Sequence, residues 1–470
     1  MRGAYRTGTL RAMHRRAFLA AAGAGLLATA AAQPARRQRV IVAGAGLAGL
    51  VAATELARAG HDVVVAEARG RPGGRIQTLR AFDDGLYAEA GALFIPDTHT
   101  RVLQYCRALS LPLRRVASRG AGEVYHVRGT RIVLGDAAAR WPLALTADEA
   151  RLGLGGMWDR YISAALGDLR DEYDRMSAAD FLRSRGASPA AVTLLGLGYL
   201  ELAGDGIESY SALAMLRDFA RQRDEKETFA IAGGNDLLPR ALAKGLGERV
   251  RYGAPVVRIE PGERRAAVVV REAGGPARLE GDRVVCTVPC SLLRTIETAP
   301  AWSPAKRRAI ESLPYTSVTR VFVQTRRRRS GPGHLSMTTD LPIGWVWEAS
   351  AGQPGERGIL EAYTAGAAAR RLAAMPAAER VAFVRAELGK VEPSLATFER
   401  GVSKVWDEDP WARGGYAWFK PGQVLGLAND LARPEGRVHF AGEHASTAPQ
   451  WLEGAVESAL RVVDEIARAG

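Results

Sequence analysis

The segment that decides the fold runs from Arg39 to Glu67 and begins Arg39-Val-Ile-Val-Ala-Gly-Ala-Gly-Leu-Ala-Gly-Leu50. Residues 40–43 form a short apolar run, as expected of a buried parallel strand. Residues 50–59 have helical spacing, and a second apolar run over 63–66 ends in Glu67. This order of strand, glycine loop, helix, strand and acid predicts a βαβ unit.

Each glycine of the G-x-G-x-x-G pattern has a physical task in such a unit. Gly44 allows the tight turn, Gly46 lets the backbone approach a pyrophosphate, and Gly49 lets the helix pack on the strand. Glu67 lies 21 residues after Gly46, where a carboxylate can accept hydrogen bonds from a ribose diol. We therefore expect a dinucleotide at this site, with free N–H groups at the helix N-terminus facing its phosphates. The alternative is a glycine-rich βα turn that holds no ligand.

The composition is that of a folded globular protein of two or three domains. The formal net charge of +13 falls to about +8 without the first 32 residues, which hold five arginines and no acid. The one dense basic run, Arg326 to Arg329, has no aromatic interleaving and no nucleic-acid module beside it. We expect a solvated loop there and no nucleic-acid partner.

The cysteines and histidines do not indicate a metal site or a disulfide framework. Cys106, Cys286 and Cys290 are expected to be buried free thiols. The seven histidines show no metal-ligand spacing with cysteines or acids, so we expect no metal.

The N-terminus resembles a twin-arginine export signal. Arg15-Arg16 precede an apolar, alanine-rich run that ends in the small residues Ala30-Ala31-Ala32. The resemblance implies that residues 1–32 are a signal peptide, that the translocation machinery is a partner, and that the protein is periplasmic or secreted. A retained N-terminal anchor is the alternative.

After Glu67, the sequence continues Ala68-Arg-Gly-Arg-Pro-Gly-Gly-Arg-Ile76. Two permissive glycines beside Arg75 can wrap a pyrophosphate while the cation neutralises its charge. The glycine pattern, the acid and this R-x-G-G-R loop together resemble the flavin amine oxidases, which include monoamine oxidases, L-amino-acid oxidases and bacterial nicotine-type oxidases. The resemblance covers nearly all of the chain after the signal and implies FAD as the dinucleotide.

The resemblance also assigns a segment beneath the flavin ring, residues 89–96. L-Amino-acid oxidases have an arginine there that binds the substrate carboxylate, whereas this chain has Phe94. A phenyl ring cannot bind a carboxylate, which argues against an ordinary α-amino-acid substrate. The segment Thr338 to Pro342, in contrast, resembles the L-amino-acid oxidase branch.

The C-terminal part carries the second strong pattern. Gly415 stands where monoamine oxidases have the cysteine bonded to the flavin, so the resemblance implies non-covalent FAD. Tyr416 and Trp451 match the two aromatic positions that flank the amine in relatives, although ordinary core packing is the alternative. Glu443 would accept from the ribityl chain, and the helix after Trp451 would face the flavin with its N-terminus.

Arg320 occupies the position of a lysine that, in many relatives, bonds through water to the flavin N5. It is a candidate catalytic residue together with Tyr416 and Trp451, and a structural ion pair is its alternative role. The full set of expected cofactor-binding residues is Gly44, Gly46, Leu47, Ala48, Gly49, Glu67, Ala68, Gly74, Arg75, Gly91, Ala92, Leu93, Phe94, Val256, Gly442, Glu443, Trp451, Leu452 and Ala455. The expected substrate-contacting residues are Phe94, Trp345, Trp347, Tyr416 and Trp451.

The predicted fold class is α/β. It comprises an FAD-binding Rossmann-like domain made of residues 33–95, 226–299 and 405–470, and an α+β substrate-binding domain with a helical insertion made of 96–225 and 300–404. Residues 98–225 are expected to be mostly helical, with loops at 120–122 and 153–156.

The predicted function is that of an exported FAD-dependent amine oxidase. A hydride passes from the carbon beside the amine nitrogen to flavin N5, and oxygen or another acceptor takes the electrons, with hydrogen peroxide as the product from oxygen. An L-amino-acid oxidase is one alternative. A flavin-dependent desaturase or isomerase on the same scaffold, and a flavin-binding protein without turnover, are the others. Assembly into a homodimer is left open.

Overall fold

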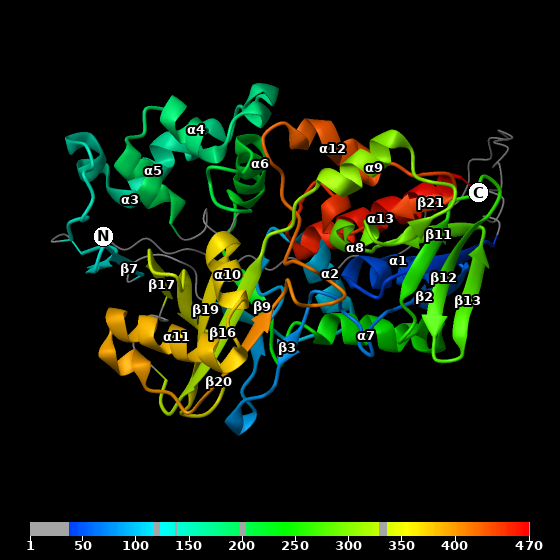
Figure 1. The fold of residues 1–470 in the computed structure, drawn as a ribbon, viewed down its shortest axis with the longest axis horizontal. Helices are drawn as coiled ribbons and strands as arrows, with labels where there is room; N and C mark the ends of the chain where they lie inside the picture. The colour runs from blue at the N-terminus through cyan, green and yellow to red at the C-terminus, as the bar shows by residue number, and fades with distance from the viewer. Residues whose placement is uncertain (1–36, 117–122, 137–138, 198–203, 329–335, 470) are drawn as a thin grey trace, which may run out of the picture. The chain divides into compact units, whose positions relative to one another are not determined.

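The computed structural model describes residues 37–116, 123–136, 139–197, 204–328 and 336–469 (Figure 1). The predicted signal at 1–32 lies outside these residues. Within them, a five-stranded parallel sheet has the order β10-β2-β1-β14-β21. Its strands are β10 (Val250–Arg251), β2 (Asp62–Ala66), β1 (Arg39–Ala43), β14 (Arg283–Cys286) and β21 (Val438–Phe440). With α1 (Leu47–Arg58) between β1 and β2, the predicted βαβ unit is confirmed.

Both faces of this sheet are covered, which is why β1 is apolar and buried from Val40 to Ala43. Val40 and Val42 pack into one core, and Ile41 packs into another on the opposite face. The first core includes residues of α1, α7 (Leu237–Leu246), α13 (Leu452–Arg468) and α2 (Thr100–Ala108). Figure 1 shows α1 and α13 side by side against the strands.

The second face is covered by a four-stranded sheet of order β13-β12-β11-β15. Its strands are β13 (Gly275–Gly281), β12 (Ala266–Glu272), β11 (Val256–Glu260) and β15 (Glu297–Thr298). The short helix α8 (Cys290–Leu293) and helices α9 (Pro304–Ser312) and α12 (Gln423–Ala432) pack beside it. The strands of the parallel sheet come from within residues 33–95, 226–299 and 405–470, and the domain division itself stays a prediction.

A seven-stranded mixed sheet of order β20-β16-β19-β18-β17-β7-β8 forms the other large layer. Its strands are β20 (Arg400–Val405), β16 (Val318–Thr325), β19 (Gly358–Ala365), β18 (Trp345–Glu348), β17 (Ser336–Thr339), β7 (Val124–Val127) and β8 (Thr130–Val133). Helices α10 (Gly366–Ala373) and α11 (Ala377–Val391) cover one face.

The register of this sheet separates two kinds of side chain. Val321, Ala362 and Val346 stand opposite one another and join the core beneath α10 and α11. Side chains alternate along a strand, so the next row lies on the opposite face. That row holds Arg320, Tyr363 and Trp345, and it faces away from α11.

The helical part contains α3 (Ala147–Tyr161), α4 (Ala178–Ser184), α5 (Pro189–Gly196) and α6 (Ala212–Gln222). Each begins at a serine or threonine whose side chain accepts a backbone N–H, a strong helix-starting signal. The expected loop at 153–156 is wrong, because α3 continues through it with a kink at Gly153 (φ 66°). The region is also less helical than expected, because β6 (Leu113–Val116), β7 and β8 lie within it.

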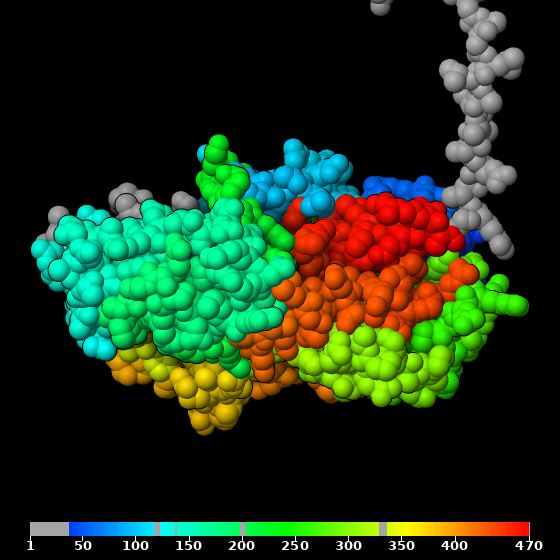
Figure 2. All heavy atoms as spheres, turned by 90° about the horizontal axis from the view of Figure 1, so that it is seen from above, coloured from blue at the N-terminus to red at the C-terminus, as the bar shows by residue number. Residues whose placement is uncertain are grey.

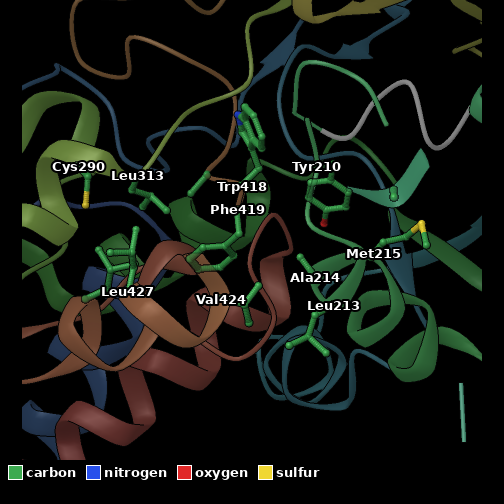
Figure 3. Packing of buried hydrophobic residues seen from close by; sticks show 14 of the residues in the cluster. Tyr210, Leu213, Ala214, Met215, Cys290, Leu313, Trp418, Phe419, Val424 and Leu427 are labelled. Carbon is green, nitrogen blue, oxygen red and sulfur yellow. The ribbon is translucent and has the colours of Figure 1, made fainter. Parts of the chain in front are cut away.

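Trp418 and Phe419 connect the helical part to the rest of the core. Phe419 lies between α6 and α12, and Trp418 packs against Tyr210 at a ring-centroid distance of 6.4 Å (Figure 3). In the space-filling view of Figure 2, the green atoms of the helical part meet the orange atoms of the segment that leads to α12. The expected burial of free Cys106, Cys286 and Cys290 is confirmed.

Two small sheets complete the description. One pairs β3 (Thr78–Leu79) with β4 (Ala88–Glu89). The other has the order β5-β9-β6, with β5 (Ile95–Pro96) and β9 (Thr228–Ile231). Among the described residues, no helix has the length and apolar character needed to cross a bilayer.

A buried contact between an arginine and a glutamic acid lies on the inner face of the seven-stranded sheet. Glu361 is fully buried, its carboxylate lies 3.4 Å from Nη1 of Arg320, and neither oxygen has a hydrogen-bond partner among the described groups. Burial raises the pKa of Glu361 to about 8; Glu89 raises this pKa further, and Arg320 opposes the shift. The carboxyl therefore holds a proton at neutral pH, so this side chain places little negative charge in the core.

This pair predicts a pH-dependent stability. Between its ordinary pKa of 4.5 and about 8, folded Glu361 keeps a proton that the unfolded chain releases, so stability is lost as pH rises through this window. Glu361→Gln cannot release a proton. Its unfolding free energy should therefore improve relative to wild type from pH 5 to pH 8, by at most about 1.4 kcal/mol per pH unit. Denaturant titrations at several pH values measure this, with the exposed Glu379→Gln as control. A pH-independent difference would contradict the assignment.

Candidate active site

The glycine turn after β1 leaves an open helix N-terminus. Gly44 has φ +107°, and Gly46 begins α1 with no side-chain cap, so the first N–H groups of α1 have no partner within the helix. A Cβ on Gly46 would meet nothing within 4 Å, so this position is open. A Cβ on Gly49 would lie 2.0 Å from the Gly44 carbonyl oxygen, so only glycine permits this packing. These features fit a dinucleotide phosphate at the N-terminus of α1.

Glu67 follows β2 and is fixed by two backbone N–H groups. Its carboxylate accepts from Ala45 at 2.7 Å and from Arg69 at 2.8 Å, and only 5% of the residue is exposed. Burial raises the pKa of Glu67, and the two backbone hydrogen bonds oppose the shift. Each oxygen keeps a second lone pair that can accept a hydrogen bond from a ligand. Contact with a ribose stays a prediction.

Arg75 and Glu443 form an ion pair that joins three distant segments. Arg75 donates to Glu443 at 2.8 Å and to the Gly415 carbonyl at 2.9 Å. Glu443 also accepts from the backbone N–H of Ala417 at 3.1 Å and of Gln450 at 2.7 Å. The expected contacts of Arg75 with a pyrophosphate and of Glu443 with a ribityl chain stay predictions.

A second ion pair was not foreseen from the sequence. Arg69 donates to both oxygens of Asp409, at 3.1 and 2.6 Å, and Lys404 donates to the same carboxylate at 2.5 Å. Burial would raise the pKa of Asp409, but the hydrogen bonds from Arg69 and Lys404 lower it overall. The pair ties the loop after Glu67 to the segment before Tyr416. No local sequence signal links residues 69 and 409, because their pairing depends on the tertiary fold.

A wall of aromatic rings lies on the inner face of the seven-stranded sheet. Trp345 and Trp347 have ring centroids 4.1 Å apart, and Phe94 lies 5.8 Å from Trp345. The hydroxyl of Tyr363 lies 3.2 Å from that of Tyr416, and the Tyr363 ring is 6.0 Å from Trp347. The wall is therefore continuous from Phe94 to Tyr416. The sequence analysis did not include Tyr363. Its two-residue spacing from Glu361 on one strand, which puts both side chains on the same face, is the signal that could have found it.

Trp451 begins α13 and contacts two other elements. Its indole N–H donates to Asp218 of α6 at 2.6 Å, and its ring packs edge-on against His99 at 5.2 Å. The side chain of the preceding Gln450, which has φ +75°, donates to the hydroxyl of Tyr210 at 3.1 Å. These bonds attach the turn before α13 to the helical part. No side chain caps α13, so its first N–H groups are free for a ligand.

Arg320 is held in place from three sides. It donates to the Glu89 carbonyl at 2.6 Å, pairs with Glu361, and lies 4.6 Å above the centre of the Tyr363 ring. The contact with Glu361 fits its alternative, structural role, and it becomes an ion pair only above the raised pKa of Glu361. The guanidinium also borders the cavity described next, so a catalytic contribution stays open to test.

One cavity of about 1170 Å³ brings the predicted residues together. Its volume exceeds the roughly 300–1,000 Å³ of a pocket for one small ligand, so it can hold a dinucleotide and a substrate. The predicted residues that border it are Gly44, Gly46, Leu47, Ala48, Glu67, Ala68, Gly74, Arg75, Gly91, Ala92, Leu93, Phe94, Val256, Arg320, Trp345, Trp347, Tyr416, Gly442, Glu443, Trp451, Leu452 and Ala455. Gly49 does not border it, consistent with its packing task.

The part of the chain that the structure describes contains no cluster of three His, Cys, Asp or Glu side chains able to hold a metal ion. A Cβ on Gly415 would lie 2.6 Å from Cγ2 of Val318, so this position has no room for the cysteine that bonds the flavin in monoamine oxidases.

Comparison with known proteins identifies the group to which the chain belongs. The model of the family described as flavin containing amine oxidoreductase matches residues 47–467. A protein of Bacillus subtilis (strain 168), "Putative L-amino-acid oxidase YobN", is 32% identical, covering 92% of this chain and 95% of that protein. An L-amino-acid oxidase of Bothrops atrox is 28% identical, covering 92% of this chain and 89% of that protein.

Among solved structures, putrescine oxidase bound to putrescine matches with a TM-score of 0.77 and 23% identity, covering 92% of this chain and 99% of that one. This match confirms the predicted mixed α/β fold. The family also confirms FAD as the cofactor and an oxidoreductase acting on amines or amino acids. The chain belongs to the flavin-containing amine oxidoreductase family.

Proposed function

We propose that this protein is an exported FAD-dependent oxidase of amines that lack an α-carboxylate. The observation that carries the proposal is the cavity wall formed by Phe94, Trp345, Trp347 and Tyr416, next to the dinucleotide cradle. These rings give an apolar slot whose faces still tolerate an amine nitrogen. Phe94 provides no cation for an α-carboxylate.

The chain's own residues would hold the cofactor and orient the amine. The free N–H groups of α1, the Glu67 carboxylate and the Arg75–Glu443 pair fit the nucleotide and ribityl parts of FAD. Bound FAD would accept a hydride at N5 from the carbon beside the amine nitrogen and pass the electrons to oxygen, giving an imine and hydrogen peroxide. Water then hydrolyses the imine to a carbonyl compound and ammonia or a smaller amine.

Tyr416 and Trp451 would flank the substrate amine and hold its C–H bond in a reactive position. Their apolar faces favour the neutral amine, because a charged ammonium loses solvation in such a slot. The planar guanidinium of Arg320 would orient a water molecule or polarise the site. The buried Glu361 carboxyl, 3.4 Å from Nη1 of Arg320, helps to fix its direction.

An L-amino-acid oxidase is the second candidate. It is favoured because the two relatives named above are described as "Putative L-amino-acid oxidase YobN" and "L-amino-acid oxidase". A panel of amines and L-amino acids separates the two. We expect anaerobic loss of flavin absorbance with amines, and peroxide release in air. Reduction by L-amino acids alone would contradict the proposal and favour the second candidate.

The role of Trp451 predicts a separation of catalysis from cofactor binding. Trp451→Ala should slow anaerobic bleaching by an amine tenfold or more, while the dissociation constant of FAD changes little. Trp451→Phe, which keeps a ring, should recover most of the rate. Stopped-flow absorbance and FAD titration measure the two effects. Trp141→Ala, in a residue that does not border the cavity, serves as control. Equal loss of FAD binding and rate would count against the assigned place.

Export is proposed from the sequence of residues 14–32, which carries the arginine pair and the apolar run of a twin-arginine signal. That pathway carries folded proteins, which suits a protein that must bind FAD before translocation. The double substitution Arg15→Lys, Arg16→Lys should leave the full-length precursor in the cytoplasm. Arg11→Lys, outside the pair, should be exported normally. Cell fractionation and immunoblotting measure this, and unimpaired export of the double variant would rule the signal out.

A further inference from the structure

Arg114 lies on the cavity side of the β5-β9-β6 sheet. Arg114 pairs with Ala230 of β9, two rows from the one that joins Val116, Thr228 and Pro96, so both rows lie on the same face. Arg114, Val116, Thr228 and Pro96 all border the cavity. The intervening row, Ile95, Phe229 and Arg115, faces the opposite side, where Ile95 and Phe229 pack into the core beneath the parallel sheet.

The same register relates Arg114 to Phe94. Phe94 precedes Ile95, so it continues β5 into the row of Ala230 and Arg114. Strands are spaced about 4.8 Å apart, which puts roughly 10 Å between the Phe94 and Arg114 backbones. Ala230 is the small residue between them. Arg114 therefore stands on the same cavity wall as the aromatic slot, two strands away from it.

Arg114 is a half-buried cation with unused donors. Its Nη1 donates to the Ala351 carbonyl at 3.0 Å, while its Nε is buried and has no hydrogen-bond partner among the described residues. No carboxylate among the described residues lies within ion-pair distance of it. A guanidinium has five N–H donors in a fork that suits a carboxylate, and a half-buried cation gains from a counter-ion.

The acids that border this cavity already accept from other groups. Asp218 accepts from Trp451, Glu225 from Thr228, Glu348 from Ser350 and Glu123 from Thr338. Among the described residues, the side chain of Arg114 has the Ala351 carbonyl as its partner and no carboxylate. A cation on this wall without a carboxylate partner matches an anionic ligand group.

We propose that Arg114 binds a carboxylate that lies at the far end of the substrate from the reacting amine. The substrate class is then an ω-amino acid, which presents its terminal amine to the aromatic slot and its acid group to Arg114. The proposal rests on the proposed amine oxidase function, and it reconciles an acid-bearing substrate with Phe94 at the α-carboxylate position.

The test compares substrates of matched length on the FAD-loaded enzyme. Alkylamines, α,ω-diamines and ω-amino acids of increasing chain length are assayed for anaerobic bleaching and steady-state turnover. We expect the best ω-amino acid to have a KM at least tenfold below that of the matching alkylamine and diamine. Arg114→Met should remove this advantage while kcat and the alkylamine KM stay within twofold. Arg114→Lys should keep part of it.

Arg115→Met is the matched control, because Arg115 is adjacent but faces the opposite side, where its exposed side chain pairs with Glu227. A readout without turnover uses simple alkanoates, whose binding is followed by the change in flavin absorbance. Arg114→Met should weaken alkanoate binding tenfold or more, and Arg115→Met should not.

The outcomes are distinguishable. Flavin that no amine reduces would overturn the proposed function and this inference together. Reduction by alkylamines and diamines as readily as by ω-amino acids, with Arg114→Met without effect, would overturn only the role of Arg114. An unchanged alkanoate affinity in Arg114→Met would do the same even if the variant turned over poorly.

Discussion

The ion pair between Arg75 and Glu443 is the constraint on which the rest of the site depends. It joins the loop after the first βαβ unit to the turn before α13, and through Gly415 and Ala417 to the segment that carries Tyr416. Both side chains are largely buried, so removal of one would leave an uncompensated charge at a cost of about 3–5 kcal/mol. The nucleotide cradle and the aromatic slot therefore keep their relative positions because of this pair.

The sequence predicted the first βαβ unit well because its motifs are contiguous and their tasks are local. The glycine turn, the helix N-terminus and the acid at the end of the second strand lie in one continuous segment. They can therefore be recognised without knowledge of distant parts of the chain. The predicted residues that border the cavity were also reached through family resemblance, which supplies the tertiary arrangement indirectly. The comparison with relatives then confirmed the fold class, the cofactor and the enzyme class, whereas the individual residue roles await experiment.

What the sequence could not predict depends on the pairing of segments far apart in the chain. The bond from Arg69 to Asp409 spans 340 residues, and the bond from Trp451 to Asp218 spans 233. Likewise, the prediction of a mostly helical region over residues 98–225 missed β6, β7 and β8. Short strands that pair with distant partners have little periodic signal of their own. The roles of Glu361 and Tyr363 can be recognised only once the strand register places them beside Arg320.

The crowded backbone at Gly415 has a consequence for how the enzyme is supplied with its cofactor. Gly415 has no sulfur, and Val318 leaves no room there for a cysteine side chain, so no thioether can link FAD to this position. Without such a bond, retention of FAD is a matter of equilibrium. Occupancy then follows the free concentration of the cofactor, and each increment of bound FAD adds to the stability of the native state by mass action. For a protein exported as proposed, slow dissociation alone would preserve the holoenzyme outside the compartment where FAD is made.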